Sequence, residues 1–135
     1  MYIVPHLTTQ ESLLTYVVAQ GNPNVRHYQA LLDAEMAALQ GKKHAAKQEY
    51  EVAVVMASRG GFIGDAALAY ERFFLYLLEI SETDEAMEKL DKAIELYSEW
   101  GAIRKATILQ ETYSYLFTKP KEILALKPAL DVWVQ

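Results

Sequence analysis

Apolar residues recur at intervals of three and four along most of this chain, which is the spacing of one face of an α-helix. Glycine, proline and short polar turns interrupt the pattern and divide it into segments. The pattern predicts helices over residues 8–19, 23–40, 42–59, 64–80, 83–100 and 102–117. Because Ala, Leu, Glu, Lys, Gln and Met outnumber Val, Ile and Thr, the predicted fold class is all-α.

The chain also repeats itself at a distance of forty residues. A shift by forty brings together Ala46 and Ala86, Tyr50 and Leu90, Ala53 and Ala93, and Gly61 and Gly101. In each copy the two alanines lie about two turns apart on one helix face, with the larger residue between them. Such small residues let a neighbouring helix approach closely. Each unit is therefore expected to be a helical hairpin.

One hairpin cannot bury its apolar face alone, so the expected architecture is a stack of antiparallel hairpins. Residues 22–117 hold the repeats, predicted to form two hairpins in a right-handed stack with the helix at 102–117 as one cap. Residues 1–21 supply an N-terminal segment with a capping helix. Residues 118–135 form a C-terminal tail that contains two prolines.

The spacing of small and large residues resembles the second half of a tetratricopeptide-like repeat, lengthened to a period of forty. The residues that carry this resemblance are Gly41, Ala46, Tyr50 and Ala53, and then Ser81, Ala86, Leu90 and Ala93. The resemblance implies an α-solenoid fold.

Over roughly residues 20–116 the chain is similar to the helical repeats of large signalling ATPases and multi-sensor histidine or serine/threonine kinases. The most specific part is the block YSEWGA, residues 97–102. In that family the repeats connect and bind, and the enzyme sites lie in other domains. The resemblance therefore implies a scaffold or adaptor for protein–protein interaction in signal transduction. A regulatory linker of such an ATPase or kinase, or a structural subunit of a larger complex, are the alternatives.

The chemistry-bearing residues do not converge. There is no cysteine, which excludes disulfides and thiolate metal sites. The three histidines fall in different predicted elements: His6, His27 and His44. We expect His27 to be structural or on the surface and His44 to be exposed near a helix start. The chain is thus predicted to be non-enzymatic, with no catalytic, cofactor or metal site.

The charge pattern limits the partners. The formal net charge is −5, and no basic stripe suited to a phosphate backbone is present, so nucleic acid is not an expected partner. No apolar run is long enough for a membrane span, and the N-terminus lacks the features of a secretory signal. We expect a cytoplasmic protein. Residues 82–99 carry seven acids against two lysines, which is either a solvated helix face or a docking surface for a basic partner.

If the first helix of each hairpin lines a concave groove, that groove could bind a peptide or a helix of a partner protein. The predicted partner-binding residues are Tyr28, Leu31, Glu35, Leu68, Glu71, Arg72, Leu75 and Trp133. Trp133 lies in a short apolar end that docks either on its own stack or on another chain. The helix at 64–80 is apolar around much of its circumference, so it is either buried on two sides or presents apolar surface to a partner. A homo-oligomer formed through that helix or through the tail is therefore an alternative.

Overall fold

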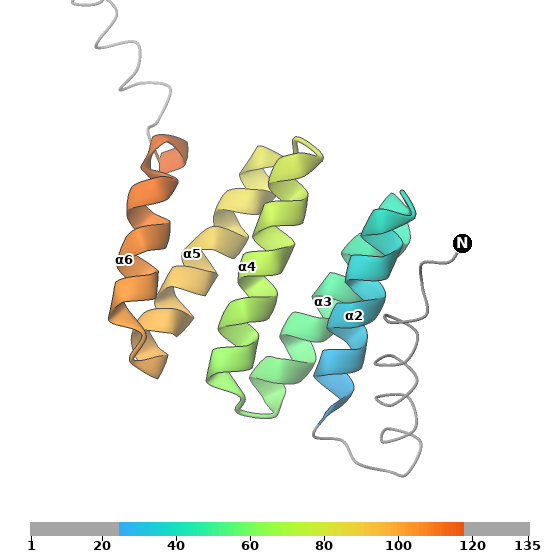
Figure 1. The fold of residues 1–135 in the computed structure, drawn as a ribbon, viewed down its shortest axis with the longest axis horizontal. Coiled ribbons are helices and arrows are strands. Elements are labelled where there is room, and N and C mark those ends of the chain that lie inside the picture. The colour runs from blue at the N-terminus through green and yellow to red at the C-terminus, as the bar shows by residue number, and fades with distance from the viewer. Residues whose placement is uncertain (1–24, 118–135) are drawn as a thin grey trace, which may run out of the picture.

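The computed structural model describes residues 25–117 and contains only helices in that range. The predicted helix at 8–19, the tail at 118–135 and Trp133 lie outside these residues. The helices are α2 (Arg26–Leu39), α3 (Lys43–Arg59), α4 (Ile63–Glu79), α5 (Thr83–Trp100), α6 (Ile103–Thr112) and the 3-10 turn η2 (Ser114–Phe117) (Figure 1). The all-α prediction is confirmed for this part of the chain.

One predicted helix is too long. The segment 102–117 was expected to be a single helix, but α6 ends at Thr112 and a 3-10 turn follows. At this point the ring of Tyr113 packs edge-on against Phe74 of α4, with 4.8 Å between the ring centroids. The Leu116 N–H then bonds to the Tyr113 carbonyl at 3.0 Å, which closes a tighter turn than an α-helix. A contact made across the fold therefore ends this helix early.

Every interhelical turn has the same geometry. Residues 41, 61, 81 and 101 all have positive φ, so a left-handed residue recurs every twenty residues. After α2, the Lys42 N–H bonds to the Ala37 carbonyl at 2.9 Å, and the Gly41 N–H bonds to the Ala38 carbonyl at 3.1 Å. Equivalent pairs of bonds close the other three turns. This is the Schellman arrangement, which satisfies carbonyls left free at a helix end.

These turns reverse the chain each time, so successive helices alternate in direction (Figure 1). The most extensive packing lies within the pairs α2–α3 and α4–α5. Packing between α3 and α4 joins the two pairs, and α6 packs on α5. The alanines at the repeat positions are all fully buried, together with the larger residues between them: Ala46, Tyr50, Ala53, Ala86, Leu90 and Ala93.

The central helix α4 is buried on two sides, which was one of the two alternatives for the segment 64–80. Phe73 stacks on Tyr50 of α3, with ring centroids 5.3 Å apart, while Phe74 meets Tyr113 beyond α6. Both phenylalanines are fully buried, and each such side chain contributes about 1.5–3 kcal/mol relative to an exposed one. The apolar circumference of α4 is thus largely used within the fold.

Candidate functional site

Each of α2, α4 and α6 carries a large, partly exposed apolar residue at the same repeat position, and we call the surface around these residues the first-helix face. They are Tyr28, Leu68 and Ile108, each forty residues from the next. Their exposed fractions are 40, 42 and 47 % respectively. The helices α2, α4 and α6 alternate with α3 and α5 along the chain, so every second helix presents one of these half-exposed apolar side chains.

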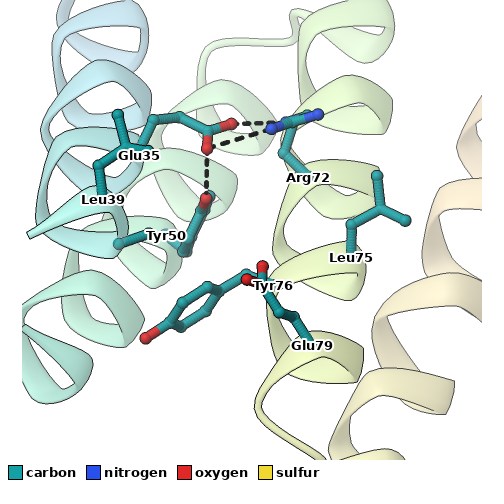
Figure 2. A pocket seen from close by; sticks show the side chains of 8 residues that line it. Glu35, Leu39, Tyr50, Arg72, Leu75, Tyr76 and Glu79 are labelled. Carbon is teal, nitrogen blue, oxygen red and sulfur yellow. Dashed lines mark hydrogen bonds and ion pairs between the residues drawn. The ribbon is translucent and has the colours of Figure 1, made fainter. Parts of the chain in front are cut away.

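A network of polar side chains ties α2, α3 and α4 together beneath this face (Figure 2). The Tyr50 hydroxyl donates to a carboxylate oxygen of Glu35 at 2.7 Å. Arg72 donates to both oxygens of Glu35, through Nε at 2.5 Å and Nη2 at 3.2 Å. Burial, and then the bond to Glu35, raise the pKa of Tyr50 well above its usual range. The charge of Glu35 is therefore compensated within the fold.

A second network repeats this design one hairpin further along. Glu71 of α4 accepts a hydrogen bond from the Tyr97 hydroxyl of α5 at 2.7 Å and from Lys105 Nζ of α6 at 3.0 Å. Burial, and then this bond, raise the pKa of Tyr97. In both networks a glutamate on a first helix binds a tyrosine of its own hairpin and a cation on the next first helix. We call the two networks the Glu–Tyr clamps.

Asp65 makes a third link, between α4 and α2. The Tyr28 hydroxyl donates to Asp65 Oδ2 at 2.6 Å, and His27 Nε2 lies 2.9 Å from the same oxygen. The His27 ring is buried and stacks on Phe62, with 4.7 Å between the centroids. His27 is thus structural, and His44 is exposed at the start of α3, both as predicted.

The predicted binding residues are brought together only in part. Glu35, Arg72 and Leu75 line one pocket, whereas Leu31 is partly buried against the core. Glu71 is held in the second clamp and Leu68 is half-exposed. Sequence reasoning missed the exposed Leu39, Glu79 and Ile108, and also Tyr76, which is buried but lines the pocket. Ile108 could have been found by applying the forty-residue shift twice, starting from Tyr28.

The pocket lies between α2 and α4 and has a volume of about 170 Å³ (Figure 2). That is close to the roughly 150 Å³ of a cavity known to accept a benzene-sized group. Leu39 and Leu75 belong to its lining, and Leu39 is 77 % exposed. The charged residues of the lining are Glu35, Arg72 and Glu79. Glu35 and Arg72 pair with each other. Glu79 is therefore the one charged residue of the lining that has no partner within residues 25–117.

A wider hollow of about 300 Å³ lies where α4 begins, lined by residues 61–65 and Trp100. Trp100, from the end of α5, is 60 % exposed. Its ring lies so close to Gly64 that a Cβ on this glycine would fall 2.7 Å from ring atoms. Gly64 therefore permits the contact that holds the start of α4 to the end of α5.

The acids of residues 82–99 lie on α5 and at the residue just before it. The exposed Lys92 lies among five exposed acids that recur at helical spacing along α5: Asp84, Glu88, Asp91, Glu95 and Glu99. We call them the α5 stripe. At the equivalent positions of α3, forty residues earlier, stand His44, Gln48, Glu51, Val55 and Arg59. The remaining two acids, Glu82 and Glu85, pair with Lys47 of α3 at 2.6 and 3.0 Å.

Comparison of the chain with protein-family models, with curated proteins and with solved structures finds no match. Within residues 25–117, no three His, Asp or Glu side chains gather into a group that could hold a metal ion. None of the helices in this range combines the length and apolarity that a bilayer span requires.

Proposed function

We propose that residues 22–117 form a tetratricopeptide-like stack that binds another protein on its first-helix face, as a non-enzymatic scaffold or adaptor. The observation that supports this is the row of Tyr28, Leu68 and Ile108. Packing between helices does not require a large apolar side chain on the solvent side of three successive repeats. A single exposed apolar residue is ordinary, but a row at one repeat position fits a recognition surface.

The Glu–Tyr clamps support the same function in a different way. The first clamp joins α2 to α3 and to α4, and the second joins α4 to α5 and to α6. The row is therefore held on a rigid support, which lowers the ordering cost of binding. Since the clamp charges compensate one another, they leave the apolar row without a competing unpaired charge from the clamps.

The test is to place a charge on the row. The variant Leu68→Lys/Ile108→Lys should lose the proteins that the wild-type chain retains in affinity purification from cell extract. The control is Gln48→Lys/Ser58→Lys, which adds the same charge at exposed positions of α3. Circular dichroism melts should show that both variants stay folded. Equal retention by all three chains would contradict the proposal.

A further inference from the structure

We infer that the pocket between α2 and α4 binds a lysine or arginine side chain of the partner together with a neighbouring aliphatic side chain. The partner segment on the first-helix face is therefore basic and carries aliphatic residues such as leucine beside its basic ones. This inference rests on the proposed function, because it names the chemistry of the partner at the same face. Its basis is the charge and the apolar surface of the pocket lining.

The charge of the lining favours a cation. Glu35 is engaged by Arg72 through two donors and by the Tyr50 hydroxyl as well. Glu79 is exposed and has no partner among the described residues, so the lining has a net charge of −1. An incoming carboxylate would meet Glu79 and could reach Arg72 only in competition with Glu35. An incoming ammonium or guanidinium would give Glu79 the partner that it lacks.

The apolar part of the lining suits the stem of a basic side chain. Leu39 is the most exposed large apolar side chain among residues 25–117, and Leu75 stands on the other side of the pocket (Figure 2). Lysine and arginine bury their methylene stems on apolar surface and keep the charged head in water. A stem between the two leucines would place its head near Glu79. An aliphatic neighbour would then cover Leu39.

The rest of the molecule strengthens this preference at long range. The chain has a net charge of −5, and this count includes the five exposed acids of the α5 stripe. Lys92 contacts one of them, Glu95, at 3.4 Å. Such a field speeds the encounter with a basic segment and slows that with an acidic one. The stripe acts through this field, whereas the contact itself belongs to the pocket.

The experiment is a titration followed by fluorescence anisotropy with two labelled peptides of about twelve residues. One is built from lysine, leucine and alanine, and its twin has glutamate in place of lysine. Each is added to the wild-type chain, to Glu79→Gln and to Asp91→Asn. Both substitutions remove one exposed acid, from the pocket and from the α5 stripe respectively. We expect the lysine peptide to bind, and Glu79→Gln to weaken it about two- to fivefold, as for an exposed ion pair. The loss of affinity in Asp91→Asn should be less than about half of the loss in Glu79→Gln.

Four results would overturn the inference: no binding of the lysine peptide, equally tight binding of its glutamate twin, no loss of affinity in Glu79→Gln, or the same loss in both variants. The variant Leu68→Lys/Ile108→Lys separates this failure from that of the proposed function. If it still loses its cellular partners while the peptides ignore Glu79, the face binds a partner of other chemistry. If it loses nothing, the proposed function fails as well.

Discussion

Ser81 occupies the left-handed region, with φ of 65°, at the position where the other three turns have glycine. A non-glycine residue there costs about 1–2 kcal/mol, and glycine recovers part of this despite its larger unfolded-state entropy. We expect Ser81→Gly to raise the free energy of unfolding by about 0.5 kcal/mol, measured by urea denaturation. The matched reverse change, Gly61→Ser at the equivalent turn, should lower it. A loss of stability in Ser81→Gly would show that its hydroxyl has a role in the turn.

Glu82 gives a second prediction at this scale, through pH. Hydrogen bonds from Lys47, and then from Lys43, lower the pKa of Glu82 from its ordinary 4.5 to about 2. A lowered pKa stabilises the fold above pH 4.5, and the contribution is lost as the pH falls towards 2. The wild-type chain should therefore have a higher urea midpoint than Glu82→Gln near neutral pH. This difference should shrink as the pH falls from 4.5 to about 2. A difference that does not change with pH would contradict the ion pairs.

At the scale of elements, α6 differs from α4 where the repeat would continue. Ala67 and Phe74 of α4 are fully buried, but forty residues later stand Thr107 of α6 and Ser114 of the following η2, both exposed. The other face of α6 keeps its buried residues, Ala106 and Leu109. Polar residues on the outer stripe are what a terminal repeat needs for solubility. That the helix beginning near residue 102 is a cap stays a prediction, and this polar stripe is the observation that favours it.

This contrast can be tested with one pair of variants. Ala67→Leu should destabilise the fold by about 1–3 kcal/mol, because the added methylenes have no space in a packed interface. Thr107→Leu, at the equivalent position of α6, should change the stability by less than about 0.5 kcal/mol. Both are measured by urea denaturation. A large loss in Thr107→Leu would mean that the outer stripe of α6 is packed against another part of the chain.

At the scale of the molecule, local sequence signals predicted the helices. The candidate site depends on contacts between distant residues, for which the sequence holds no comparable signal. Apolar spacing and closing glycines are local, so α3 and α5 were predicted to within one residue at each end. The clamps join residues far apart: Glu35 meets Tyr50 fifteen positions later and Arg72 thirty-seven positions later. Nothing in the neighbourhood of any of the three indicates these partners, because the register between packed helices selects them. Glu79 became a candidate only once α2 and α4 were placed side by side.

Stability should also be distributed unevenly along the stack. In α4 seven residues are buried, whereas in α6 only Ala106 and Leu109 are, and among the described helices α6 packs mainly on α5. Since each buried leucine or phenylalanine contributes about 1.5–3 kcal/mol, α6 should open at a free energy at least about 2 kcal/mol below that of α4. Native-state hydrogen exchange followed by NMR measures this for each amide. Lys105→Met removes the α6 end of the second clamp, so it should lower protection in α6 by up to about 1 kcal/mol and leave α2 unchanged. Equal opening free energies in α4 and α6 would mean that the helices unfold as one cooperative unit, and that the stability of each helix is not set by its own buried residues and its contacts with neighbouring helices.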